Sequence, residues 1–210
     1  ADGIMIARGD LGVEIPPENV PYLQKLIIQK CNDNYRPVIT ATQMLDSMIR
    51  NPRPTRAEVT DVANAVYDGT DAVMLSGETA SGKYPLEALQ MMVHIVENTE
   101  EHLDYDLIMR KAEEQRMKST SSALSHATVT TANNLGAKCI IAPTASGATA
   151  RVVSKFKPRT EIIGVTPNEE VMRRMQIYWG VRPLKSIEFT TTEDVCSGAI
   201  DLVVAKQIVE

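Results

Sequence analysis

A short apolar run near the N-terminus leads directly into a glycine and a carboxylate. Residues 4–7 form the run, and Arg8, Gly9 and Asp10 follow it. Gly9 lets a ligand approach the backbone, and consecutive N–H groups at the start of a helical turn can bind an anion such as a carboxylate group. The side chain of Asp10 offers the oxygen ligand that Mg²⁺ prefers. The alternative is that Asp10 is only a turn or N-cap residue.

Two further apolar runs also end in small polar or acidic residues. One contains Thr40 and Thr42, whose hydroxyls can donate to a bound oxyanion. The other ends in Ser76 and Glu78 on either side of a glycine, which repeats the order of glycine and carboxylate. The alternatives are ordinary strand threonines and a glycine turn with a helix cap. Small polar or acidic residues after three consecutive strands weaken these alternatives without excluding them.

A fourth segment, residues 144–149, places hydroxyls before a helix in the second half of the chain. Thr144, Ser146 and Thr149 carry the hydroxyls, and Gly147 lies among them. Such a loop at a helix N-terminus suits a phosphate group. The lysine of a P-loop nucleotide-binding motif is absent from it. An ordinary capped turn between strand and helix is the alternative.

The elements that position these residues form strand–helix repeats. Short β-branched and apolar runs of this kind are typical of a parallel sheet that is buried on both faces. Thr55 and Glu58 predict a capping box at the start of the helix that follows the second run, and Gly69 predicts its end. Repeats with short connections predict a parallel α/β architecture, whose sites lie at the C-terminal ends of the strands.

A second α/β unit begins near Ser119. Thr166 and Glu169 predict another capping box, and the charged residues 155–159 are expected to be the solvated end of a helix. The unit is a small open sheet of at least three strands, predicted at residues 139–142, 162–165 and 181–184, with helices predicted at 121–135 and 167–178.

Composition excludes several classes of function. The chain has 210 residues, of which 43% are hydrophobic and 23% charged, as in an ordinary globular protein. Its net charge of −5 argues against a nucleic-acid partner, because binding to phosphates needs a basic face. No apolar run approaches the ~20 residues of a membrane span. The three cysteines are far apart and have no Cys-x-x-Cys spacing, so we expect reduced thiols and a cytoplasmic protein. An apolar run at the first residues and an uncapped helical pattern at the last ones indicate a piece of a longer protein.

Several of these segments are similar to pyruvate kinase. Ile6 to Pro16 resembles the segment of the family's sixth barrel strand, and Ile39 to Met48 resembles that of the seventh. The resemblance continues through residues 51–59, 61–71 and 74–80 and covers about the first hundred residues, while the remainder resembles the family's C-terminal regulatory domain with weaker motifs.

The resemblance implies an α/β fold made of a partial (β/α)8 barrel, its last three βα units, followed by a small open α/β C-terminal domain. Residues 1–100 would belong to the catalytic barrel and residues 101–118 would form a connecting helical segment. Residues 119–210 would form the regulatory domain, truncated at its end. Three barrel strands leave an unpaired sheet edge.

The reaction implied is phosphoryl transfer from phosphoenolpyruvate to ADP in glycolysis, which gives pyruvate and ATP. By resemblance, Asp10 is a ligand of the essential metal, and the N–H groups of Gly9 and Asp10 with the Thr42 hydroxyl hold the substrate carboxylate. Ser76 and Glu78 are expected to act near the site in a supporting or proton-relay role. Thr144, Ser146, Gly147 and Thr149 match the effector phosphate loop.

The implied cofactors are Mg²⁺ or Mn²⁺, together with K⁺, whose ligands are not in this chain. The full-length parent is expected to be a homotetrameric, cytoplasmic, allosteric enzyme that binds ATP and responds to a phosphorylated effector. The chain alone is expected to be inactive, because the family's phosphoryl-stabilising lysine lies outside it. Two alternatives are a metal-dependent lyase on a pyruvate or phosphoenolpyruvate barrel, and a non-catalytic module for effector binding and oligomerisation.

Overall fold

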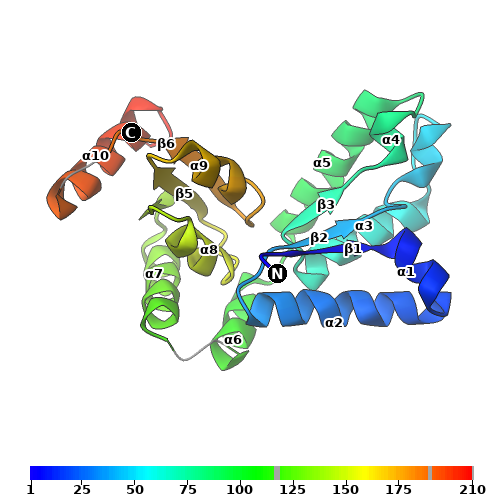
Figure 1. Ribbon diagram of the computed structural model, residues 1–210, viewed down its shortest axis with the longest axis horizontal. Coiled ribbons are helices and arrows are strands. Elements are labelled where there is room, and N and C mark those ends of the chain that lie inside the picture. The colour runs from blue at the N-terminus through cyan, green and yellow to red at the C-terminus, as the bar shows by residue number, and fades with distance from the viewer. Residues whose placement is uncertain (116–118, 189–190, 210) are drawn as a thin grey trace. The chain divides into compact units, whose positions relative to one another are not determined.

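The computed structural model describes residues 1–115, 119–188 and 191–209, and the chain divides into two compact units (Figure 1). The first unit comprises Ala1–Leu103 and the second comprises Asp104–Glu210. Each unit contains one three-stranded sheet in which all strands are parallel. The predicted α/β class is therefore confirmed.

The first unit has the strand order β1-β2-β3. A capping box of Thr55 and Glu58 begins α3, and Gly69 ends it in the left-handed conformation, as the sequence predicts. The elements of this unit are β1 (Ile4–Ala7), α1 (Arg8–Glu14), the 3-10 turn η1 (Pro17–Asn19), α2 (Val20–Asp33), β2 (Val38–Ala41), the 3-10 turn η2 (Asp46–Ile49), α3 (Arg56–Asp68), β3 (Ala72–Met74), α4 (Gly77–Ala80) and α5 (Pro85–Glu101).

Two apolar clusters stabilise the first unit. One joins β1 and β2 to α2 through Ile6, Ile28 and Val38, all of which are buried. The other is formed by the loop after β2 with α3 and α5, and it buries Met44, Leu45, Met48, Val62, Ala65, Ala88, Met92 and Ile95. The loop after β2 is thus part of the core at the edge of the sheet where the polar residues gather.

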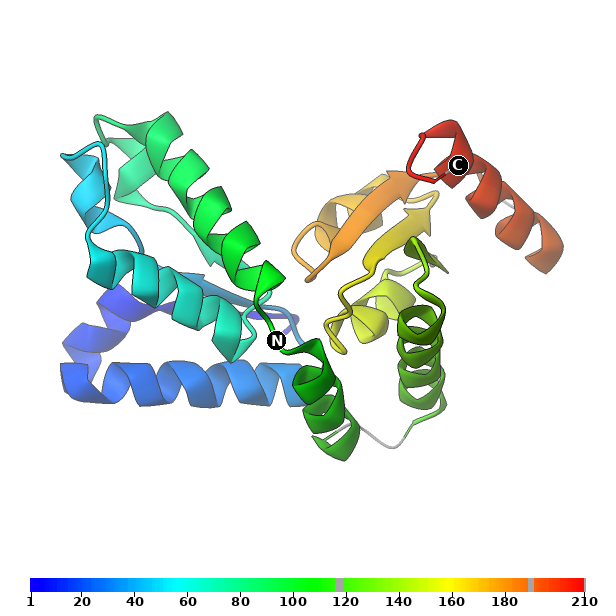
Figure 2. The same cartoon turned by 180° about the vertical axis from the view of Figure 1, so that it is seen from behind.

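The second unit has helices on both faces of its sheet. Ile140 and Ile162 belong to a cluster with α7, α8 and α9, whereas Ile163 and Val165 face α10 (Figures 1 and 2). Its elements are α6 (Tyr105–Gln115), α7 (Thr120–Leu135), β4 (Cys139–Pro143), α8 (Ala148–Ser154), β5 (Glu161–Thr166), α9 (Glu169–Met175), β6 (Val181–Lys185) and α10 (Thr192–Ala205), in the strand order β4-β5-β6.

Two local predictions for the second unit are wrong. Helix α9 has Asn168 as its N-cap, whose side chain accepts from two backbone N–H groups, so the capping box predicted for Thr166 and Glu169 does not form. Lys155 and Lys157 are buried, although residues 155–159 were expected to be solvated. The Lys157 ammonium lies 4.4 Å from the centre of the Trp179 ring, a contact that offsets part of its loss of hydration.

Candidate functional site

The carboxyl ends of β1, β2 and β3 lie at one edge of the first sheet. Ala7 pairs with Ala41, and Ala41 pairs with Met74. The three strands therefore end at the same level of the sheet. The structure therefore brings together three of the four predicted segments, those that contain Gly9 and Asp10, Thr42, and Ser76 and Glu78.

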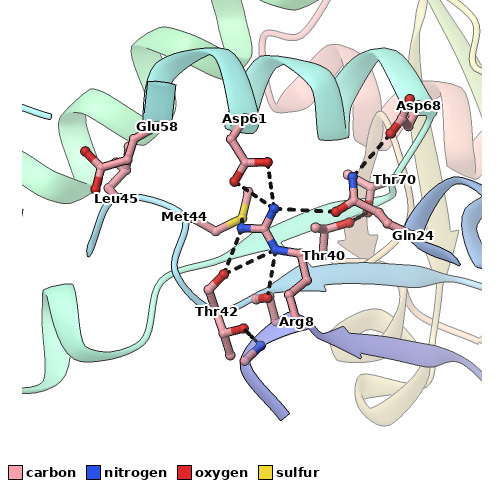
Figure 3. A network of polar contacts seen from close by, with 12 residues as sticks. Arg8, Gln24, Thr40, Thr42, Met44, Leu45, Glu58, Asp61, Asp68 and Thr70 are labelled. Carbon is pink, nitrogen blue, oxygen red and sulfur yellow. Dashed lines mark hydrogen bonds and ion pairs between the residues drawn. The ribbon is translucent and has the colours of Figure 1, made fainter. Parts of the chain in front are cut away.

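Arg8 lies at the centre of a polar network at this edge (Figure 3). Its guanidinium donates from Nη2 to the Thr42 carbonyl oxygen at 2.8 Å, and both carboxylate oxygens of Asp61 lie 2.7 Å from its Nη1. Nη1 also donates to Oε1 of Gln24 at 3.4 Å. One side chain from the end of β1 thus connects the loop after β2 with helices α2 and α3.

The Thr42 side chain also connects the first two strand ends. Its Oγ1 accepts a hydrogen bond from the Gly9 N–H at 2.8 Å. A hydroxyl that accepts in this way retains its proton for donation to a further acceptor. Thr42 and Gln43 both have positive φ angles, of 70° and 54°, which is unusual for residues other than glycine.

Glu78 joins the third strand end to the same loop. The residue is only 2% exposed. Oε1 accepts from the Leu45 N–H at 3.0 Å, and Oε2 accepts from the Ser76 N–H at 2.8 Å. The two carboxylate oxygens therefore fix the backbone after β2 and the backbone after β3 relative to each other. This geometry suits a supporting role.

Glu58 holds the far end of this loop. It accepts from the N–H and the hydroxyl of Ser47 at 2.7 and 2.6 Å, while its Oε2 also accepts from the Thr55 N–H at 2.7 Å. Burial raises the pKa of Glu58, but the hydrogen bonds from Ser47 and Thr55 together outweigh burial and hold the pKa below its ordinary value.

Asp10 is placed differently from these carboxylates, because it is exposed in the first turn of α1. A carboxylate oxygen there fits as one ligand of a hard cation. Among the residues that the structure describes, no three His, Cys, Asp or Glu side chains are grouped so that they could hold a metal ion. Asp10 itself offers one exposed carboxylate at this edge of the sheet.

The fourth predicted segment lies in the second unit, where residues 144–147 connect β4 to α8 and Thr149 belongs to the first turn of α8. Thr144 accepts a hydrogen bond from the Gly147 N–H at 2.9 Å through its hydroxyl, and Gly147 has a φ of 81°. Ser146 and Thr149 are exposed. The segment is thus a compact turn with one exposed hydroxyl residue in the turn and another at the start of α8.

Three residues of this edge to which sequence reasoning assigned no role in a site are Arg8, Asp61 and Glu58. Arg8 and Asp61 are 53 positions apart, so no local spacing connects them. Glu58 was predicted only as a capping residue, since its contacts to Ser47 span 11 positions and depend on the path of the loop. The pairing of the strands and the packing of α3 against them place these side chains together.

Comparison with known proteins assigns both units to one family. The model of the pyruvate kinase barrel domain matches residues 1–89, and the model of the pyruvate kinase alpha/beta domain matches residues 122–210. The chain belongs to the pyruvate kinase family. In the described part of its barrel unit, three parallel strands form an open sheet rather than a closed barrel.

Individual pyruvate kinases match over nearly the whole chain. The enzyme of Clostridium acetobutylicum is 52% identical over 96% of this chain and 42% of its own length. That of Geobacillus stearothermophilus is 50% identical over all of this chain and 36% of its own length. A crystal structure of a pyruvate kinase from Cryptosporidium parvum matches with a TM-score of 0.95 and 44% identity, over 100% of this chain and 43% of that one. The chain thus spans about two fifths of the length of these relatives.

Proposed function

We propose that this chain is the part of a pyruvate kinase that binds the carboxylate of phosphoenolpyruvate and responds to an effector. The full-length enzyme transfers the phosphoryl group of phosphoenolpyruvate to ADP in glycolysis. The observation that carries this proposal is the contact between the Gly9 N–H and the Thr42 hydroxyl, at the same sheet edge as Asp10. Family membership and this placement at the ends of parallel strands support it together.

Thr42 and the first turn of α1 would orient the substrate. The first N–H groups of a helix have no intrahelical acceptor, and α1 has no side-chain cap, so the Asp10 N–H is suited to a carboxylate oxygen. The Thr42 hydroxyl would donate to the same group while it accepts from Gly9. Phosphoryl transfer depends chiefly on positioning and charge neutralisation, which makes such preorganised donors effective.

Asp10 would be one ligand of a divalent cation, Mg²⁺ or Mn²⁺. When bound, such a cation neutralises charge that develops on the transferring phosphoryl oxygens. By the resemblance, other segments of the full-length enzyme would supply the remaining ligands of this cation and the ligands of K⁺. They would also supply most contacts to ADP or ATP. We therefore expect the chain alone to be inactive, and the full-length enzyme to be a cytoplasmic homotetramer.

An ADP-dependence assay tests this function. Pyruvate formation from phosphoenolpyruvate is measured with and without ADP, for the chain alone and for an enzyme of full family length that carries these residues. The proposal expects ADP-dependent pyruvate formation by the full-length enzyme and none by the chain alone. Pyruvate released without ADP would instead favour a lyase. Absence of any turnover by the full-length enzyme would favour a non-catalytic binding module.

The loop of residues 144–149 is the candidate for effector binding. Its exposed Ser146 and Thr149 hydroxyls lie next to the left-handed turn at Gly147. In the full-length enzyme, Ser146→Glu would place a carboxylate where an effector phosphate should bind. We expect the variant to lose activation by phosphorylated sugars and to retain basal turnover, because the loop would act on a conformational equilibrium. Activation equal to that of the parent would leave the loop as a structural turn.

A further inference from the structure

The backbone of Thr42 is held in an unfavourable conformation. A β-branched residue at a φ of 70° is strained, and Gln43 continues the strain with a φ of 54°. Conformations of this kind persist only where the surrounding structure fixes them. Contacts from other elements must therefore keep the Thr42 hydroxyl in place.

Arg8 makes the contact that does this. Its Nη2 and Nε both donate to the Thr42 carbonyl oxygen, at 2.8 and 3.3 Å, and Nε lies 3.4 Å from the carbonyl oxygen of Ala41 (Figure 3). The rigid fork of a guanidinium fixes the direction of an acceptor in a way that a single ammonium does not. Arg8 also precedes Gly9 in the chain, so one residue holds both partners of the Gly9–Thr42 hydrogen bond.

Asp61 in turn orients Arg8. The Arg8 side chain is 10% exposed, and a cation at such a position needs a counter-charge. Both oxygens of the Asp61 carboxylate lie 2.7 Å from Nη1, on the side of the guanidinium that faces α3. Gln24 is the other side-chain oxygen acceptor on Nη1, at the longer distance of 3.4 Å, and it carries no charge.

We infer that Asp61 is a positioning residue for phosphoenolpyruvate binding. It holds the Arg8 guanidinium, which fixes the strained backbone of Thr42 and so aims the Thr42 hydroxyl beside the Gly9 N–H. Asp61 touches neither substrate nor metal and acts only through Arg8. The inference rests on the proposed function, since it concerns the carboxylate donor of that site.

Asp61→Asn in the full-length enzyme tests this chain of contacts. The amide keeps an oxygen acceptor for Arg8 but removes the charge, so we expect kcat/KM for phosphoenolpyruvate to fall about tenfold and KM for ADP to stay near that of the parent. Asp68→Asn is the matched control, because Asp68 lies on the same helix, pairs with Lys25, and reaches Arg8 only through Gln24. The control is expected to retain the parental kinetics.

A double substitution separates positioning from general stability. If Asp61 acts through Thr42, Asp61→Asn has little further effect in a Thr42→Val background, because the hydroxyl that it aims is already gone. A merely structural Asp61 would lower kcat/KM by the same factor in both backgrounds, and that result would overturn the inference. Arg8→Lys is the second variant if Asp61→Asn does not fold. It keeps the charge, loses the fork and is expected to show the same selective loss for phosphoenolpyruvate.

Hydrogen exchange of the Gly9 amide supplies a readout that does not depend on turnover. This N–H donates to Thr42 Oγ1, so its protection is expected to fall in Asp61→Asn and to stay unchanged in Asp68→Asn. A parent without ADP-dependent turnover would refute the proposed function, and Gly9 exchange would then decide the positioning by itself. Parental protection of Gly9 together with parental phosphoenolpyruvate kinetics in Asp61→Asn would refute the inference.

Discussion

The loop after β2 and the loop after β4 both contain left-handed backbone, but different residue types adopt it. Both follow a parallel strand and both include left-handed backbone. The first uses Thr42 and Gln43 for it, whereas the second uses Gly147, for which a positive φ carries no steric cost. Strain is therefore present in the first loop and is avoided in the second.

The contacts that hold the two loops differ accordingly. Arginine and glutamate side chains from three elements hold the first loop: Arg8 contacts Thr42, Glu78 contacts Leu45, and Glu58 contacts Ser47. The second loop closes on itself through the Thr144 hydroxyl, which bonds a residue only three positions away. The comparison indicates that contacts from other elements fix the side chains of the first loop. In the second loop, the exposed hydroxyl residues can be substituted without loss of the turn.

The largest effect is expected from Asp10→Ala in the full-length enzyme. Loss of a metal ligand removes charge neutralisation of several kcal/mol from the transition state, so kcat should fall by at least about a hundredfold. Folding should be unaffected, because Asp10 is exposed. Steady-state rates at saturating Mg²⁺ and circular dichroism provide the measurements. A kcat near that of the parent would contradict the assignment of Asp10 as a metal ligand.

A smaller effect is expected from Thr42→Val, which keeps the β-branched shape and deletes the hydroxyl. A hydrogen bond to a charged group contributes about 1.5–3 kcal/mol, so kcat/KM for phosphoenolpyruvate should fall by about tenfold or more. Kinetics with each substrate varied in turn will check this. A change confined to ADP would assign the hydroxyl to the other substrate.

The glycine of the second loop supplies the third test. A Cβ on Gly147 would lie 3.3 Å from both Met175 and Val171, whereas a Cβ on Gly136, which also has a positive φ, would meet nothing within 4 Å. Gly147→Ala should therefore destabilise the second unit by about 1 kcal/mol more than Gly136→Ala. Urea denaturation followed by fluorescence of Trp179, the single tryptophan, measures both. Equal losses would show that the pocket around Gly147 adapts.

The smallest effect is expected on thermal stability, from substitutions of Glu58 and Glu169. The pKa values of both carboxylates lie below the ordinary value of 4.5. Lys185 and Arg173 lower the pKa of exposed Glu169, while hydrogen bonds to Ser47 and Thr55 outweigh burial and lower that of Glu58. A lowered pKa means that the ionised form stabilises the fold above about pH 4.5 and that this contribution is lost as the pH falls through the folded-state value.

Glu58→Gln and Glu169→Gln should accordingly both lower Tm at pH 7, and each difference from the parent should shrink below pH 4. High salt should remove the Glu169 difference, because exposed ion pairs are screened, and leave most of the Glu58 difference. Thermal unfolding at 0.1 and 1 M salt measures this. Equal salt sensitivity would contradict the assignment of hydrogen bonds to Glu58.

Much of the local structure follows from the sequence alone. The capping box of Thr55 and Glu58, the helix end at Gly69 and the parallel strands were predicted because each depends on neighbouring residues or on a short apolar run. The start of α9 was missed because Thr166 and Asn168 compete for the same cap and only the path of the chain after β5 decides between them. Buried Lys157 was missed because its partner Trp179 is 22 positions away.

The sequence by itself therefore determined the class of fold and which strand ends carry the polar residues, since periodicity, caps and glycines act over a few positions. Only the tertiary structure decided how those residues are held. The bonds of Arg8 to Thr42 and Asp61, and of Glu78 to Leu45, join positions 33 to 53 residues apart. No spacing rule connects such positions, because the register of the parallel sheet and the packing of α3 on it set the distances between them.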